Sequence, residues 1–183
     1  VGPVCLAPAS VNAHTHLELS HLADKTRWGH GFTAWLQSLV PLLGAAPQTD
    51  AVENACASLA LYGTLYVGNI TGSLPGGTVL ADSACNEAGL TASHFCEWFG
   101  YDAPFADNER PWPPRCRQAL ADDPFLMARC APGGHALYST GPEILSAARQ
   151  DCSRMGRVFS FHLAESPEET QLLTSGSGPL RDL

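Results

Sequence analysis

Two histidines separated by one residue are the positions in this sequence with the clearest capacity for chemistry. His14 and His16 follow the short run 8–11, and together these residues indicate the end of a buried β-strand. Side chains at positions i and i+2 of a strand point to the same face, so both imidazoles can face one cation while Thr15 points away. Imidazole is a ligand for zinc and other first-row metals. Strand histidines are also common as surface or packed residues, so the spacing alone leaves both interpretations open.

Composition and charge indicate an ordinary globular protein. The chain has 183 residues, of which 45% are hydrophobic and 15% are charged. A chain of this length can form about one domain with a substantial core. Its net charge of −8 argues against nucleic acid as a partner, because a phosphate backbone requires a clustered basic surface. No run approaches the roughly 20 apolar residues of a membrane span, so no membrane partner is expected either.

The cysteines are predicted to be reduced thiols. All seven occur singly, and none forms a CxxC pair, so the spacing favours neither a zinc ribbon nor a thioredoxin-like motif. Cys56, Cys96 and Cys130 lie in apolar stretches, where a free cysteine behaves as a small hydrophobic residue. Reduced thiols of this kind are typical of a cytoplasmic protein.

Strands and helices are predicted to alternate about five times along the chain. The first strand ends at His16, and the next four are predicted over residues 64–70, 90–98, 125–131 and 157–162. Helices are predicted over residues 32–43, 50–60, 79–88, 114–121, 142–155 and 167–173. This alternation predicts a parallel sheet covered by helices.

Histidines and carboxylates recur where these predicted strands end. They are His14, His16, Glu97, His135 and His162. Parallel α/β folds place their functional sites at the C-terminal ends of strands. An open doubly wound sheet is the alternative, but the sequence has neither a GxGxxG motif nor a P-loop. The preferred fold is therefore an α/β barrel of the (β/α)8 TIM type, of which this chain supplies about the first five β/α units.

The remaining histidines have no predicted catalytic role. His94 should share a strand face with Cys96, which favours a hydrogen-bonded core residue. His21 and His30 lie in the first long loop, where substrate contact is the most that can be assigned to them.

Three motifs together resemble the metal-dependent amidohydrolase superfamily. They are NAHTHLELS at residues 12–20, HALYS at 135–139 and HLAES at 162–166. The resemblance is greatest to the branch of deaminases and chlorohydrolases that act on amino- or halo-substituted heterocycles, and it runs from about residue 8 to the last residue. One departure is Leu137, which stands where a proline is common in that branch.

The resemblance implies metal-dependent hydrolytic deamination. His14, His16 and His162 would hold one divalent ion, with zinc the first choice and iron the alternative, because three imidazoles suit both. A water activated by the ion would attack the ring carbon of the substrate. Glu165 would carry the proton of that water to the ring nitrogen and then to the departing ammonia. The structural alternative for Glu165 is an acidic residue at the N-terminal end of a helix.

The resemblance also implies substrate contacts. His135 would contact the substrate rather than the metal. Glu97 would hydrogen-bond an amino group or a ribose hydroxyl, with a salt bridge at the barrel edge as the alternative. Trp28, together with Phe32 and Trp35, could form a wall for a planar ring, although their helical spacing favours Phe32 and Trp35 as core residues.

The predicted substrate is an aminopurine nucleoside. The segment 25–36 is similar to enzymes that deaminate 6-amino-6-deoxyfutalosine. Deaminases of adenosine, 5'-methylthioadenosine and S-adenosylhomocysteine share the same core motifs. Hydrolysis of a cyclic amide and dechlorination of a triazine are the alternatives within the superfamily.

The chain is expected to be part of a catalytic barrel. The family has eight barrel strands, a small β-sandwich, a histidine on the sixth strand and an aspartate on the eighth, and this sequence ends at Leu183 before those residues. We therefore expect residues 1–183 to form the N-terminal part of the barrel and to be inactive alone. The alternative is a non-catalytic metal-binding half-barrel that assembles with a second chain. The sequence leaves the oligomeric state open, a homo-oligomer included.

Overall fold

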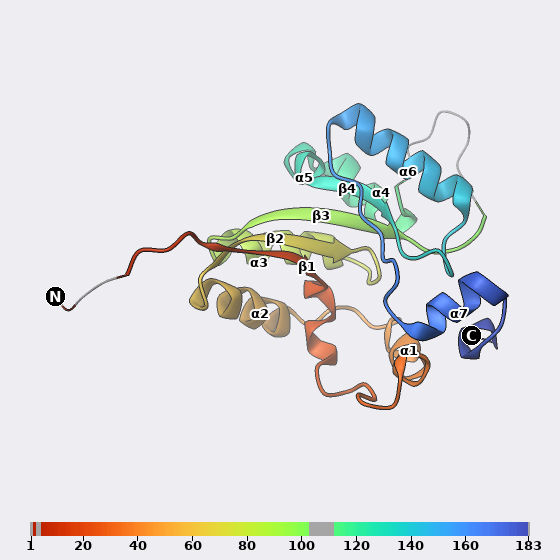
Figure 1. Ribbon diagram of the computed structural model, residues 1–183. Coiled ribbons are helices and arrows are strands. Elements are labelled where there is room, and N and C mark those ends of the chain that lie inside the picture. Colours follow the sequence, from red (N-terminus) through yellow and green to blue (C-terminus); the bar gives the residue numbers. More distant parts are fainter. Residues whose placement is uncertain (1, 3–4, 103–111, 183) are drawn as a thin grey trace.

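Four parallel β-strands form the centre of the structure (Figure 1). The computed structural model describes residues 2, 5–102 and 112–182. The strands lie side by side in chain order: β1 (Ser10–Thr15), β2 (Thr64–Thr71), β3 (Thr91–Trp98) and β4 (Cys130–Gly134). Because the strands are parallel, their C-terminal ends meet at one edge of the sheet, and the residues that follow them are brought together there.

Helices connect the strands and cover the sheet. The α-helices are α1 (Phe32–Leu39), α2 (Thr49–Leu61), α3 (Gly77–Glu87), α4 (Pro114–Asp122), α5 (Pro124–Arg129), α6 (Pro142–Met155) and α7 (Pro167–Ser175), and the 3-10 helices are η1 (Leu17–Leu22), η2 (Val40–Leu42) and η3 (Pro179–Asp182). The alternation confirms the predicted α/β class. Across the described ranges, none of these helices has the length and apolar character needed to span a bilayer.

Two apolar clusters hold the helices on the sheet. The first joins β2 and β3 to α2 and α3 and consists of Leu17, Val52, Cys56, Val67, Ala81, Ala84, Cys85, Leu90 and Ala92. The second joins β3 and β4 to α4 and α5 and consists of Cys96, Trp112, Cys116, Leu120, Leu126 and Cys130. All seven cysteines are free thiols, as predicted, and six of them are buried. Burial of these clusters fixes the strands whose ends form the site.

The strand predicted over residues 125–131 is wrong for most of its length. Residues 124–129 form the short helix α5, and the strand β4 begins only at Cys130. The Asp123 carboxylate accepts hydrogen bonds from the backbone N–H groups of Phe125 and Leu126, and Pro124 occupies the first helical turn. Such a cap with a proline at its start favours a helix over a strand. The strand β4 consequently continues to Gly134, three residues beyond the predicted end of that strand.

The fifth predicted strand, over residues 157–162, is also not formed as a strand. Among the residues that the structure describes, it pairs through an isolated parallel bridge between Ala136, just after β4, and His162, where the His162 N–H donates to the His135 carbonyl at 2.7 Å. The segment is held at its start by the Arg157 guanidinium, which donates to the Met127 carbonyl at 2.9 Å. A side-chain anchor at one end and a single bridge at the other replace a continuous ladder. The described part of the chain thus has four regular strands.

Gly68 permits the close approach of β1 and β2 that sets the position of His14. A Cβ atom at Gly68 would lie 2.3 Å from the Ala13 carbonyl oxygen, and backbone atoms cannot move aside as the end of a side chain can. Gly68→Ala is therefore expected to lower the free energy of unfolding by about 1–3 kcal/mol, measured by urea denaturation. Gly44→Ala, at a position with open space around it, is the control and should lose nothing. Equal stability of the two variants would contradict the prediction.

Candidate metal centre and active-site cavity

Three histidine side chains converge at the C-terminal edge of the sheet. His14 and His16 come from the end of β1, and His162 comes from the segment after α6. The Nε2 atom of His162 lies 3.2 Å from Nε2 of His14 and 3.3 Å from Nε2 of His16. The three nitrogen atoms all lie within 4.8 Å of one another. Three ring nitrogens pointed at one place are a ligand set for a first-row divalent cation.

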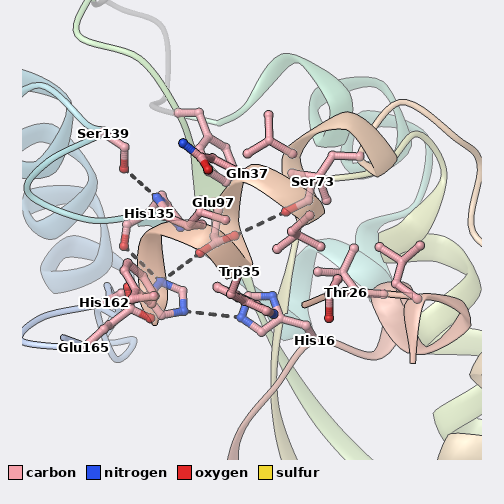
Figure 2. Close-up of a pocket in the computed structure, with 18 of the residues that line it drawn as sticks. His16, Thr26, Trp35, Gln37, Ser73, Glu97, His135, Ser139, His162 and Glu165 are labelled. Carbon is pink, nitrogen blue, oxygen red and sulfur yellow. Dashed lines mark hydrogen bonds and ion pairs between the residues drawn. The ribbon is translucent and has the colours of Figure 1, made fainter. Parts of the chain in front are cut away.

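The orientation of the His162 ring is fixed from its other nitrogen. Nδ1 lies 3.0 Å from the His135 carbonyl oxygen and 3.1 Å from Oε1 of Glu97, whose side chain is buried (Figure 2). A carbonyl oxygen can only accept, so Nδ1 carries the proton and Nε2 presents a lone pair. Metal-binding histidines commonly have such an oxygen partner behind them. Glu97 thus has His162 as a partner, and its predicted contact with the substrate stays a prediction.

Burial and mutual repulsion keep the β1 histidines neutral. Burial, with the nearby His162 ring, lowers the pKa of His14 below its usual value. The same two causes, with smaller contributions from His14 and His135, lower the pKa of His16 to about 3. For His162, burial lowers the pKa, but the Glu97 carboxylate outweighs it and the net shift is upward. Neutral imidazole is the form that binds metal, so His14 and His16 are ready to bind at neutral pH.

His135, predicted to contact the substrate, lies beside this cluster. Its Nδ1 is 2.5 Å from the Ser139 hydroxyl, and the Phe99 ring stacks on it with centroids 4.4 Å apart. Burial, followed by the charge of His162, lowers the pKa of His135 to about 3. A ring held by stacking and by one hydrogen bond, and kept neutral, can offer Nε2 to a bound molecule.

A cavity of about 910 Å³ opens in front of the histidines. Its polar lining includes His16, His135, His162, Glu97 and Glu165, all labelled in Figure 2. Its aromatic lining residues are Trp28, Phe32, Trp35, Phe99, Tyr101 and Tyr138. Trp28 lies at the exposed rim, with its ring 6.0 Å from that of Trp35. The expectation that Phe32 and Trp35 are core residues is wrong, because both line this cavity. Aromatic walls with a few convergent polar groups suit a planar heterocycle.

Glu165 lies at the wall of the same cavity and just before helix α7. Ala164 has a left-handed backbone with φ of 58°, which turns the chain between His162 and Glu165. The Tyr138 hydroxyl donates to Oε2 of Glu165 at 3.2 Å. Burial, with the Glu165 charge, raises the pKa of Tyr138, so the phenol remains a neutral donor. The structural alternative is present as well: Ser166 caps α7 by accepting from the Glu169 N–H, which places Glu165 at the N-terminal end of that helix.

Glu18 is a buried acidic residue near the site for which the sequence predicted no role. Glu18, two residues after His16, is fully buried, and its carboxylate accepts from the N–H groups of Ser73 and Leu74 at 2.7 and 3.0 Å and from the Thr71 hydroxyl at 2.7 Å. Burial raises the pKa of Glu18, and these hydrogen bonds oppose the rise. The signal available in the sequence was a glutamate between two leucines. Its partners, more than 50 residues away, could not be inferred from it.

The chain is similar to known deaminases in both sequence and structure. No protein-family model matches it. It is 27% identical over 176 residues to an adenosine deaminase of Helicobacter pylori, a match that covers 94% of this chain and 41% of that protein. Its structure superposes on that of the H. pylori aminofutalosine deaminase in complex with methylthio-coformycin, with a TM-score of 0.75, 24% identity, and coverage of 93% of this chain and 40% of the other. The chain resembles the amidohydrolase-superfamily deaminases.

A second solved structure supports the same fold. It is a zinc-bound adenosine deaminase from Xanthomonas campestris, with a TM-score of 0.64 and 18% identity, and the match covers 96% of this chain and 40% of that one. The chain thus spans about 40% of the length of the relatives that it matches. These likenesses confirm the predicted partial barrel of the TIM type for the described part of the chain.

Proposed function

We propose that the protein containing this chain is a metal-dependent hydrolytic deaminase of an aminopurine nucleoside or a related amino-heterocycle. The convergence of three Nε2 atoms at the wall of an aromatic cavity is the observation that supports the proposal most strongly. The similarity to adenosine and aminofutalosine deaminases supports the choice of substrate class.

The chemistry of the donor set fits a divalent ion held by His14, His16 and His162. A divalent ion of this kind, when bound, lowers the pKa of water toward about 7 and so supplies a nucleophile at neutral pH. The zinc in the X. campestris structure favours zinc for this chain too. His162 would keep Nε2 directed to the ion through the contacts of its Nδ1 with Glu97 and the His135 carbonyl.

The proton transfers would fall to Glu165. Its carboxylate lines the cavity, and the Tyr138 hydroxyl restrains Oε2. Oε1 would then take a proton from the attacking water and pass it first to the ring nitrogen and then to the departing amine, which leaves as ammonia. His135 would accept a hydrogen bond from the substrate at Nε2, and Trp28, Phe32 and Trp35 would exclude water from one side of the ring.

Ammonia release by the intact gene product tests this function. The zinc-loaded protein is incubated with adenosine, 5'-methylthioadenosine, S-adenosylhomocysteine and 6-amino-6-deoxyfutalosine, with a cyclic amide and a chlorotriazine as comparison substrates. We expect at least one nucleoside to release ammonia, and we expect a chelator to abolish the release until zinc is restored. Inertness toward all four nucleosides would overturn the proposal. Turnover of the cyclic amide or of the chlorotriazine alone would identify a different hydrolase of the same fold.

A further inference from the structure

A line of polar side chains crosses the sheet on the face opposite the cavity. Asn69 of β2 pairs in register with Thr15 of β1 on one side and with His94 of β3 on the other, and both Asn69 and His94 are fully buried. Two residues earlier on their strands, Val67 and Ala92 belong to the apolar cluster under α2 and α3. Side chains two apart on a strand share a face, so Asn69 and His94 also face the helices.

These side chains connect helix α5 to the backbone beside a predicted metal ligand. Oδ1 of Asn69 accepts from the Leu17 backbone N–H at 3.0 Å, and Nδ2 of Asn69 lies 3.0 Å from Nδ1 of His94. Nε2 of His94 lies 3.2 Å from Oδ1 of Asp82. The Asp82 carboxylate is held in turn by two hydrogen bonds from Arg129, at 2.7 and 2.6 Å.

The direction of every hydrogen bond in this line follows from its first member. A backbone N–H only donates, so the Asn69 amide must turn its oxygen to Leu17 and its NH₂ group to His94. His94 Nδ1 therefore accepts, and the neutral ring has its proton on Nε2 for Asp82. Asp82 is an acceptor only, since hydrogen bonds from His94 and Arg129 outweigh the effect of burial and hold its pKa below the usual range. All donors point toward Asp82, and a flip of the Asn69 amide or of the His94 ring would break two contacts.

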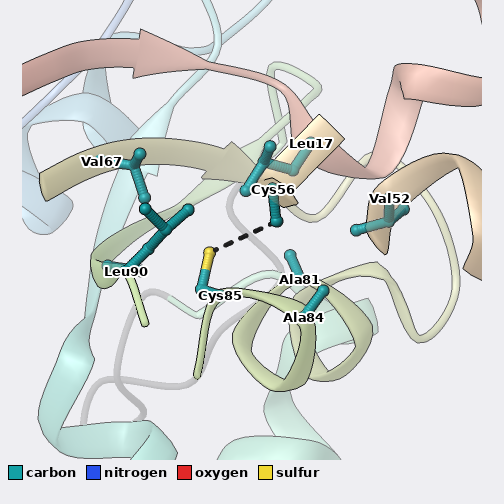
Figure 3. Packing of buried hydrophobic residues seen from close by; sticks show 9 residues of the cluster. Leu17, Val52, Cys56, Val67, Ala81, Ala84, Cys85 and Leu90 are labelled. Atoms are coloured by element: carbon teal, nitrogen blue, oxygen red, sulfur yellow. Dashed lines mark hydrogen bonds between the residues drawn. The ribbon is translucent and has the colours of Figure 1, made fainter. Parts of the chain in front are cut away.

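The end of this line holds the peptide group that follows His16. The carbonyl of His16 accepts from the Leu19 N–H at 3.0 Å, while the next N–H, of Leu17, is held by Asn69. Both ends of the peptide are thus fixed, and with them the backbone of His16, which has φ of −114° and ψ of 75°. Leu17 itself packs in the apolar cluster with Val67 (Figure 3).

We infer that Asn69 is a positioning residue for His16, supported by His94 and Asp82. The inference rests on the proposed function, because only a metal bound by His16 requires the His16 backbone to be held in place. Partners that orient metal ligands from behind are typically worth about 10–100-fold in metal affinity. Asn69 would act in this way through the backbone, on the face of the sheet that the metal does not touch.

Two readouts on the intact gene product test the inference. The first is hydrogen exchange of the Leu17 amide in metal-free protein, and the second is the dissociation constant for zinc, measured by chelator competition. Asn69→Ala removes the acceptor. Asn69→Asp keeps the size of the side chain and an oxygen that can accept from the Leu17 N–H. Ile144→Ala, a fully buried position on α6, is the control for general loss of stability.

We expect Asn69→Ala to speed exchange at Leu17 and to weaken zinc binding by about 10–100-fold. Asn69→Asp and Ile144→Ala should stay within about threefold of wild type in zinc affinity, a change well below that range. Should Asn69→Ala not fold, Asn69→Ser, whose oxygen is one bond shorter, makes the same comparison. Wild-type zinc affinity in the folded variant, or an equal loss in Ile144→Ala, would overturn the inference. A different outcome would count against the proposed function instead: Asn69→Ala speeds exchange at Leu17, but the wild-type protein itself binds no zinc.

Discussion

Replacing His162 by alanine is expected to weaken zinc binding by at least about 100-fold. Loss of a residue that only orients a metal ligand costs about 10–100-fold in affinity, and loss of a ligand itself should cost at least the upper value. The ring supplies the nitrogen that lies 3.2 and 3.3 Å from those of His14 and His16, so its removal leaves only two imidazoles. It also leaves the buried Glu97 carboxylate with only the Ser73 hydroxyl, 3.4 Å away, among its contacts to His162 and Ser73, which destabilises the metal-free fold. Zinc content after dialysis and competition with a chelator are the measurements.

Two further variants separate metal binding from folding. His14→Ala removes another ring of the cluster but keeps the contact between Glu97 and His162, so it should lose zinc with a smaller loss of stability. His30→Ala removes an exposed histidine outside the cavity lining and should keep wild-type zinc content. Full zinc occupancy in both His162→Ala and His14→Ala would rule out this cluster as the metal site.

Glu165→Gln is expected to lower kcat by about 10²–10⁴-fold while zinc content and KM remain close to wild type. Glutamine keeps the size of the side chain and an oxygen for the Tyr138 hydroxyl, but it cannot accept the proton of the attacking water. Steady-state ammonia release with the best nucleoside, together with zinc analysis, separates these quantities.

The control for this variant is an acidic residue with only a structural role. Glu143 is exposed and lies in the first turn of α6, as Glu165 lies at the start of α7. A carboxylate that serves only the helix dipole contributes about 0.3–1 kcal/mol to stability and nothing to turnover. Glu143→Gln should therefore keep its kcat. If Glu165→Gln behaves in the same way, Glu165 is an N-terminal helix acid and another group moves the proton.

Local patterns in the sequence were enough to predict most of the helices and three of the strands. The apolar spacing over residues 52–60 and Pro142 in a first helical turn are local signals, and the structure has α2 and α6 within a few residues of the predictions. The prediction was wrong at α5, where the short apolar run from Phe125 to Ala128 is compatible with either element. The Asp123 cap decided that segment, and a cap of this kind is easily missed beside a strong apolar run.

What the sequence by itself determined was the set of chemical groups: an HxH pair, a distant histidine followed by a glutamate, and aromatic residues in the first loop. What only the tertiary structure decided was which groups meet. His162 reaches His16 across 146 positions of the chain, and Glu97 lies 3.1 Å from His162 at the cavity wall. Strand register decided that Asn69 and His94 lie in one row beneath Leu17. Periodicity reports which face a side chain occupies, whereas hydrogen bonds between strands depend on register and on the approach of backbones far apart in sequence.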